Sequence, residues 1–126
     1  MNRCYACRKA LEKKWQLKFC SNQCQADYRY KTFVTKWLSG AKVTTVNTSS
    51  HIRRYLIETR GAKCSACGWD KKNPVTRRTP IEVDHIDGDS INNSTQNLRL
   101  LCPNCHALTP SFRNLNKGKG RAWRRK

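Results

Sequence analysis

Residues 98–106, LRLLCPNCH, predict a strand, a metal knuckle and a helix within nine positions. Residues 98–101, LRLL, predict a short strand. Pro103 suits the first turn of a helix, because its missing N–H would have no intrahelical partner there. The two cysteines have the C-x2-C spacing that directs two thiolates at one metal ion. The predicted helix carries His106 directly after the second thiolate.

A second C-x2-C pair, Cys64 and Cys67, lies upstream, and 34 residues separate it from Cys102 and Cys105. Gly68 follows this pair, as expected where the backbone of a knuckle needs a positive φ. The start of the chain, MNRCYACRKALEKKW, has no apolar run typical of a secretion signal. Four thiolates in such a context favour a structural zinc ion over disulfides. Zinc would then close the intervening segment into a loop.

This segment contains IEVDHIDGD, residues 81–89, which holds four of the eight carboxylates of a chain whose net charge is +18. Apolar Ile81 and Val83 alternate with Glu82 and Asp84, which predicts a half-buried strand over 81–85. The sequence DGDSINNSTQ that follows is rich in turn-forming residues and predicts a loop. Four acids within nine residues of so basic a chain mark this segment as a candidate functional site.

Asp87 and Asp89 lie in the sequence DGDS, which is similar to the start of a calcium loop. Ile91 stands where such a loop needs a third oxygen ligand, and Leu98 stands where it needs the closing Glu. We therefore interpret Asp87 and Asp89 as side chains that shape the loop by binding its backbone.

A separate cysteine quartet near the start of the chain has the spacing C-x2-C-x12-C-x3-C and comprises Cys4, Cys7, Cys20 and Cys24. This spacing suits a second tetrahedral zinc ion. Ser21 is predicted to cap a helix that buries Phe33, Val34, Trp37 and Leu38 and ends near Gly40. The segment resembles a small treble-clef zinc finger, in which a knuckle and a helix N-terminus supply two ligands each.

Residues 40–50, GAKVTTVNTSS, are small and polar and predict a linker. Residues 49–61, SSHIRRYLIETRG, predict a short helix with a serine cap and a glycine end, whose arginines are expected to contact phosphate. His51 has no cysteine or carboxylate at ligand spacing and is interpreted as a surface residue.

The net charge of +18 and the isoelectric point near 10.1 favour nucleic acid as the partner, because bound phosphates release counterions. The C-terminal sequence KGKGRAWRRK predicts a flexible phosphate-binding arm. Its candidate DNA-binding residues are Lys117, Lys119, Arg121, Arg124 and Arg125. No apolar run approaches the roughly 18 residues of a membrane helix, so no membrane partner and a cytoplasmic location are expected.

Asp84-His85-Ile86, Asn97-Leu98 and Cys102-Pro103-Asn104-Cys105-His106 together resemble the HNH endonucleases, zinc-stabilised ββα-metal nucleases common among phage-encoded enzymes. The resemblance covers residues 61–116 and implies a small α+β fold. In this family the histidine of the D-H pair is the general base, and the preceding aspartate and the helix histidine bind a divalent ion. The middle asparagine orients the base and braces the loop. These roles would fall on His85, Asp84, His106 and Asn97, respectively.

Some relatives add a metal-binding histidine one helical turn later, where this chain has Thr109 and Pro110. Asn114 or Asn116 is the candidate for that ligand. The carboxylate and imidazole suit magnesium, manganese or nickel better than a thiolate pocket would. The resemblance thus implies two structural zinc ions and one catalytic divalent ion.

The resemblance implies an endonuclease that nicks DNA as a monomer, in the host cytoplasm if phage-encoded, and leaves 5′-phosphate and 3′-hydroxyl ends. An imidazole with a pKa of about 6.5 can accept a proton from water at neutral pH. A non-catalytic zinc-dependent DNA-binding or regulatory protein, an RNA-processing enzyme and a dimer are the alternatives. Four parts are expected: a zinc finger with its helix (1–39), a linker with a short helix (40–60), the nuclease core (61–116) and a basic tail (117–126).

Overall fold

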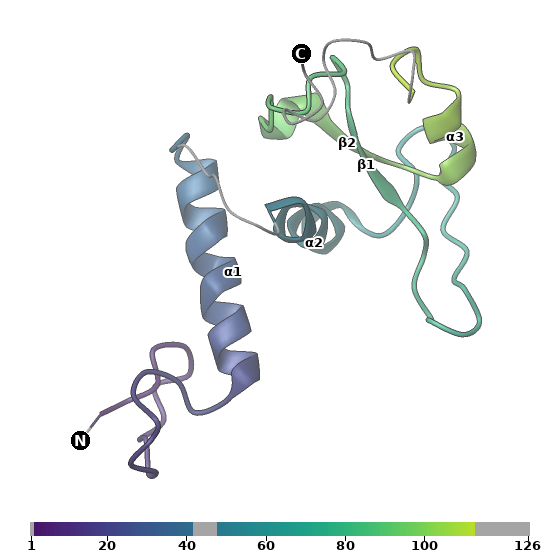
Figure 1. Cartoon of the computed structure of the whole chain (residues 1–126). Coiled ribbons are helices and arrows are strands. Elements are labelled where there is room, and N and C mark those ends of the chain that lie inside the picture. Colours follow the sequence, from purple (N-terminus) through teal and green to yellow (C-terminus); the bar gives the residue numbers. More distant parts are fainter. Residues whose placement is uncertain (1, 42–47, 113–126) are drawn as a thin grey trace. The chain divides into compact units, whose positions relative to one another are not determined.

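The computed structural model describes residues 2–41 and 48–112, so the predicted roles of Asn114, Asn116 and the tail cations fall on residues outside the described part. Helices α1 (Asn22–Leu38) and α2 (Thr48–Arg60) come first in the chain. Strand β1 (Glu82–His85), the 3-10 helix η1 (Thr95–Asn97), strand β2 (Leu98–Leu101) and helix α3 (Pro103–Ala107) follow (Figure 1). This small α+β architecture confirms the predicted fold class.

The chain divides into two compact units, Met1–Ile52 and Arg53–Lys126, and the boundary falls within α2. No helix in the described ranges is both long and apolar enough to cross a membrane.

In the N-terminal unit, a knuckle leads into α1. A β-bridge joins Arg3 to Ala10, and Cys4 N donates to Lys9 O at 2.8 Å. Ser21 caps α1 as predicted, because its hydroxyl accepts a hydrogen bond from Cys24 N at 3.1 Å. Gly40 follows the helix with a φ of 85°, which suits glycine in this left-handed region.

Helix α1 buries an aromatic stripe formed by Tyr30, Phe33 and Trp37. Two predicted positions of this face are less enclosed, since Val34 is half-buried and Leu38 is 50% exposed at the end of the helix. The half-buried His51 ring lies 5.1 Å from the Phe33 ring and 5.7 Å from the Tyr30 ring, measured between centroids. His51 is therefore a packing residue and not a ligand, although it is less exposed than a surface residue.

Helix α2 starts at Thr48, one residue before the predicted start of the helical segment at Ser49. The predicted end is confirmed, because Gly61 follows with a φ of 86° and its N–H donates to Ile57 O at 2.9 Å. Leu56 is fully buried and belongs to the core of the C-terminal unit.

Two of the three α2 arginines, Arg53 and Arg60, bind backbone carbonyls, and the contact of the α2 arginines with phosphate stays a prediction. Arg53 donates to Ile81 O at 3.1 Å and to Thr79 O at 3.4 Å. Arg60 donates to Leu98 O at 2.7 Å and to Thr95 O at 3.0 Å. Ile81 O and Leu98 O lie at strand ends, where the guanidinium groups supply donors to the backbone. Thr79 O and Thr95 O also accept from the backbone N–H groups of Ile81 and Leu98, respectively. Arg53 and Arg60 therefore tie α2 to the sheet.

The sheet consists of β1 and β2, which pair antiparallel. The register places Asp84 opposite Arg99 and His85 opposite Leu98. Alternation along β1 directs Glu82 and Asp84 to one face and His85 to the other. Ser65 N donates to Leu100 O at 2.8 Å, which joins the Cys64 knuckle to β2. The sheet thus holds the D-H pair between the knuckle and α3.

Candidate active site and metal centres

Both cysteine quartets come together as predicted, and the ligand atoms of each group lie within 4.8 Å of one another. The Sγ atoms are 3.5 Å apart for Cys7 and Cys20 and 3.8 Å apart for Cys67 and Cys102. Tetrahedral zinc with bonds of about 2.3 Å would separate its sulfur ligands by about 3.8 Å, whereas a disulfide bond measures about 2.05 Å. All eight cysteines are free thiols. Each group could therefore hold one ion such as zinc.

The protonation of these thiols differs within each group. At Cys4 burial opposes ionisation, but neighbouring backbone N–H groups outweigh it and lower the pKa to about 6. Burial and backbone N–H groups act in the same way on Cys64, whose pKa also falls to about 6. Contacts with other thiols raise the pKa of Cys20 and of Cys105 to about 12. Because bound ligands must be thiolates, ion binding has to release protons, and affinity should rise with pH.

The second quartet also positions helix α3, which carries His106. Cys102 is the N-cap of α3, and its Sγ accepts a hydrogen bond from Cys105 N at 3.4 Å. Pro103 occupies the first turn as predicted. His106 is the residue after Cys105, so the cysteine group also fixes the backbone position from which the His106 side chain extends.

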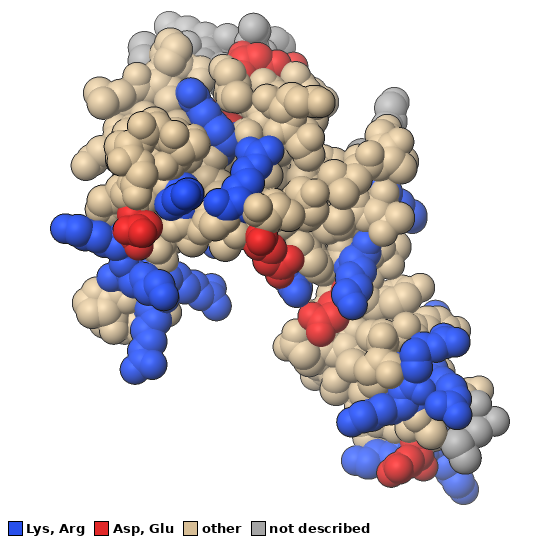
Figure 2. Space-filling view, turned by 180° about the vertical axis from the view of Figure 1, so that it is seen from behind, with Lys and Arg blue, Asp and Glu red and all other residues tan. Residues whose placement is uncertain are grey.

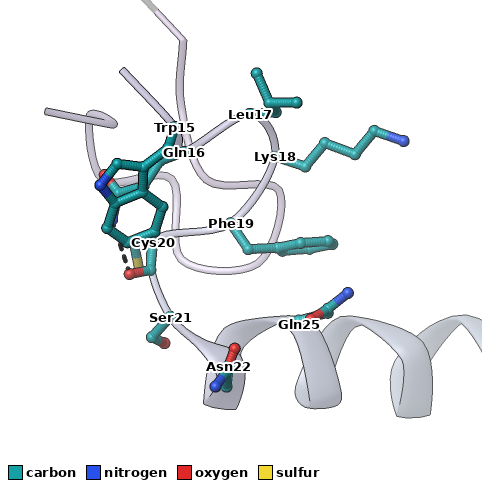
Figure 3. Close-up of a pocket in the computed structure, with 9 residues that line it drawn as sticks. All are labelled: Trp15, Gln16, Leu17, Lys18, Phe19, Cys20, Ser21, Asn22 and Gln25. Atoms are coloured by element: carbon teal, nitrogen blue, oxygen red, sulfur yellow. Dashed lines mark hydrogen bonds between the residues drawn. The ribbon is translucent and has the colours of Figure 1, made fainter. Parts of the chain in front are cut away.

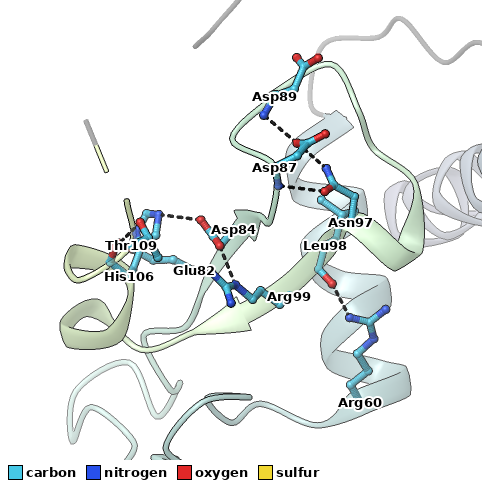
Figure 4. A network of polar contacts seen from close by, with 10 residues as sticks. All are labelled: Arg60, Glu82, Asp84, Asp87, Asp89, Asn97, Leu98, Arg99, His106 and Thr109. Carbon is cyan, nitrogen blue, oxygen red and sulfur yellow. Dashed lines mark hydrogen bonds and ion pairs between the residues drawn. The ribbon is translucent and has the colours of Figure 1, made fainter. Parts of the chain in front are cut away.

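Charged side chains from both strands gather around His106 (Figure 4). Asp84 is only 5% exposed, and its Oδ2 accepts a hydrogen bond from Arg99 Nε at 2.7 Å. Its other oxygen, Oδ1, lies 3.7 Å from His106 Nε2. Glu82 binds the opposite imidazole nitrogen, His106 Nδ1, through Oε2. Asp84 Oδ1 and His106 Nε2 thus face each other, while Arg99 and Glu82 bind the opposite atoms of the two side chains.

The separation of Asp84 Oδ1 and His106 Nε2 fits a shared divalent ion. At 3.7 Å it is too long for a hydrogen bond. Two metal–ligand bonds of about 2.1 Å can span up to about 4.2 Å, so one ion can bind both atoms. An anionic oxygen and an imidazole nitrogen form a donor set that accepts magnesium, manganese or nickel.

His85 is the last residue of β1 and points to the other face of the strand. Adjacent residues can serve one site only if the strand ends or bulges, and here it ends. His85 Nε2 lies 2.8 Å from Asn93 Oδ1, which belongs to the loop after β1. The imidazole is half-buried and fixed at one nitrogen by an amide oxygen.

Asn97 holds the loop that follows His85. Its Nδ2 donates to Asp87 Oδ1 and to Asn92 O, both at 2.9 Å, and its Oδ1 accepts from Asp87 N at 3.0 Å. Asp87 also accepts from Asp89 N at 2.8 Å, and Asp89 Oδ1 accepts from Ile91 N at 3.1 Å. These contacts agree with the interpretation of Asp87 and Asp89 as loop-shaping residues.

Sequence reasoning missed three residues of this site. Alternation along the strand could have indicated Glu82, because it shares a face with Asp84. Arg99 needs the cross-strand register, and Asn93 needs the path of the loop. Neither Arg99 nor Asn93 lies at a sequence spacing from the motif residues that would have indicated its role.

A pocket of about 470 Å³ lies in the N-terminal unit, beside the start of α1 (Figure 3). Trp15, Leu17 and Phe19 supply its apolar wall, and Gln16 Nε2 donates to Cys20 O at 3.1 Å. Its lining contains no histidine and no carboxylate.

The comparisons with known proteins address the same region. Residues 64–109 match the family model described as HNH endonuclease. The chain is 34% identical over 95 residues to a protein named H-N-H endonuclease F-TflIV, from Escherichia phage T5. The alignment covers 75% of this chain and 40% of that relative, so the chain spans less than half of the relative's length. No solved structure matches the chain. The D-H pair, Asn97 and His106 all lie within residues 64–109, the part of the chain that matches an HNH endonuclease domain.

Proposed function

We propose that this chain is a metal-dependent endonuclease that nicks DNA and leaves 5′-phosphate and 3′-hydroxyl ends. One observation carries the proposal: Asp84 Oδ1 and His106 Nε2 face each other at 3.7 Å beside the strand end that bears His85. A buried carboxylate paired with an imidazole has no evident purpose in a module that only grips phosphates. The net charge of +18 supports a polyanionic substrate.

Asp84 and His106 would hold the divalent ion. Such an ion supplies electrostatic stabilisation of the charge that develops on the phosphate and on the departing 3′ oxygen. Arg99 fixes the Asp84 carboxylate through Oδ2 and leaves Oδ1 available. Glu82 fixes the His106 ring through Nδ1, which leaves the Nε2 lone pair for the ion.

His85 would act as the general base through Nδ1. An amide oxygen can only accept a hydrogen bond, so the contact with Asn93 Oδ1 places a proton on His85 Nε2. Nδ1 then keeps its lone pair in the neutral imidazole and can take a proton from the attacking water. In this proposal Asn93 orients the ring, and Asn97 acts one step further away by bracing the loop.

Each cysteine group would hold one structural zinc ion, and the N-terminal finger would add affinity for DNA. Exposed cations gather over this finger, as the face seen in Figure 2 shows. They are Arg3, Arg8, Lys9, Lys13, Lys14 and Lys18. We propose that the chain acts as a monomer in the host cytoplasm, with the tail cations as further phosphate contacts.

Replacing Glu82 by Ala should weaken binding of Mn²⁺ about 10- to 100-fold, since histidine ligands lose basicity and orientation without their outer partner. Titration calorimetry of the DNA-free protein measures this affinity, and Mn²⁺ avoids the thiolate groups because it prefers oxygen and nitrogen. Glu58→Ala is the matched control, because Glu58 pairs with Arg54 on the surface of α2. If the Glu82 variant bound Mn²⁺ as tightly as the wild type, Glu82 would have no role in metal binding.

Replacing Asn93 by Leu should slow cleavage about 10- to 100-fold, because a misplaced catalytic group loses rate steeply. Asn93→Asp keeps an acceptor oxygen and should retain more activity. Nitrogen-15 NMR of the His85 ring in the metal-free protein should show the Nε2–H tautomer in the wild type and a tautomer mixture in the Leu variant. Gln96→Ala, in the same loop, is the control. An unchanged tautomer and rate in Asn93→Leu would refute the role.

Cleavage of supercoiled plasmid in Mg²⁺ or Mn²⁺ tests the proposed function. Open circles should form first, and DNA ligase should reseal them, because ligation requires adjacent 5′-phosphate and 3′-hydroxyl ends. A matched RNA should be cut more slowly. Circles that ligase cannot reseal would contradict the end chemistry, and faster cutting of RNA would favour the RNA-processing alternative.

A further inference from the structure

A basic loop, residues 70–79, extends between the Cys64 knuckle and β1 (Figure 1). It carries Lys71 and Lys72 on one arm and Arg77 and Arg78 on the other, and all four are exposed. Asp70, at its base, is the single carboxylate of the loop. The family resemblance assigns no role to these residues, because the shared motifs begin after the loop, apart from the Cys64 knuckle.

The four cations have no partner within the described residues. Ion pairs among the described residues include those of Arg54 with Glu58, of Arg99 with Asp84, and of His106 with Glu82 and Asp84. By contrast, Arg53 and Arg60 of the same unit are bound to backbone carbonyls. The loop cations thus differ from the structural arginines of this unit and are available to an anionic ligand.

The loop is held in one conformation by its own hydrogen bonds. Asn73 Oδ1 accepts from Val75 N at 2.8 Å and from Thr76 N at 3.1 Å. Asn73 N donates to Arg78 O at 2.9 Å, and Arg77 N donates to Asn73 O at 2.8 Å. Arg77 adopts a φ of 59°, a left-handed conformation that this network maintains.

The base of the loop is anchored as well. Thr79 is 4% exposed, and its hydroxyl donates to Asp70 O at 3.1 Å across the two arms. Arg53 donates to Thr79 O and to Ile81 O, and Ile81 is 2% exposed. A preorganised loop loses little conformational entropy on binding, so its charges can contribute fully to affinity.

We propose that this loop grips the backbone phosphates of duplex DNA, with Lys71, Lys72, Arg77 and Arg78 as the contacts. The proposal rests on DNA as the substrate class and assigns the surface that holds it outside the catalytic residues. Both arms carry two cations, so the loop can neutralise phosphates on either side of itself. The exposed tip residue Val75 carries no charge and is not needed for this contact.

Binding of a short fluorescent DNA duplex to the full chain tests the proposal. His85→Ala serves as the background so that the duplex is not cut, and the affinity is measured over a series of KCl concentrations. The slope of log K against log[salt] is negative, and the term salt slope refers here to its magnitude. Changing all four cations to Gln should lower this salt slope by about 0.9 for each phosphate that the loop no longer neutralises, up to about 3.6. Affinity at low salt should fall at least about tenfold.

Two controls distinguish the effect of the loop cations on DNA binding from the effect of the net charge of the chain. Val75→Ser changes the tip, keeps all four cations and should leave the slope unchanged. A second fourfold variant removes the same charge elsewhere, at Arg29, Lys31, Lys36 and Lys63, which are all exposed. It should lower the slope less than the loop variant. Equal decreases in the two fourfold variants would overturn the proposal, because net charge alone would explain them.

The two proposals can fail separately. If the wild-type chain binds duplex DNA through the loop but never cleaves it, the proposed nuclease function is wrong and the proposed role of the loop is supported. If the wild type cleaves DNA and the loop variant keeps the full salt slope, the loop proposal fails and the nuclease stands. Thermal melting of every variant confirms that it is folded.

Discussion

Removing the ion from the Cys64, Cys67, Cys102 and Cys105 group is expected to unfold the C-terminal unit. Cys64 is 2% exposed and Cys102 is 4% exposed, and together they join the knuckle to the start of α3. The unit otherwise has a two-stranded sheet of four-residue strands and a five-residue helix. Binding of structural zinc contributes about 10–16 kcal/mol, which equals or exceeds the about 5–15 kcal/mol stability of typical domains.

Two treatments distinguish this group from the catalytic site. A strong zinc chelator should abolish the melting transition of the unit in circular dichroism, whereas washing out only weakly bound ions should stop cleavage and leave the transition intact. Cys64→Ser should mimic the chelator, and Ser65→Ala, at an exposed neighbour, should not. A zinc-free protein with an unchanged melting transition would show that the thiolates do not stabilise the fold.

Replacing His85 by Ala is expected to lower the cleavage rate about 100- to 10,000-fold, the usual contribution of a general base. The structure gives the reason, since His85 ends β1 with Nε2 held by Asn93 and Nδ1 left as an acceptor. The substitution leaves Asp84, His106 and both cysteine groups in place. DNA affinity and the melting temperature should therefore remain close to those of the wild type.

The first-order rate constant of nicking at saturating Mg²⁺ measures the His85 effect. His51→Gln is the matched control, because His51 packs against the aromatic rings of Tyr30 and Phe33 in α1. Its rate should equal that of the wild type. A His85 variant that nicks as fast as the control would show that another group takes the proton.

Local signals in the sequence predicted much of the fold. The Ser21 cap, the Pro103 start and the glycines after α1 and α2 each act within one helical turn, so their neighbours suffice to predict them. Both cysteine quartets follow from ligand spacing. The start of α2 was predicted one residue late, because the helix begins at Thr48.

The partners of the catalytic residues could not be predicted in this way. Arg99 meets Asp84 only because the strands pair in one register, and a shift of one residue would turn Arg99 to the other face. Asn93 reaches His85 because Asn97 and Asp87 close the loop between them. Arg53 was predicted to contact phosphate, because a sequence does not show that its guanidinium group binds Thr79 O and Ile81 O. The roles of Arg99, Asn93 and Arg53 depend on contacts between residues that are distant in the sequence.

The central claim is that Asp84, His85 and His106 form a metal-dependent phosphodiesterase site. The most direct measurement follows the conversion of supercoiled plasmid to open circles by the full wild-type chain, first without divalent ions and then after Mg²⁺ or Mn²⁺ is added. We predict no conversion without the ion, rapid conversion after its addition, and almost none with His85→Ala. Equal inertness of the wild type and the His85 variant, while both bind the plasmid, would contradict the claim and identify a DNA-binding protein.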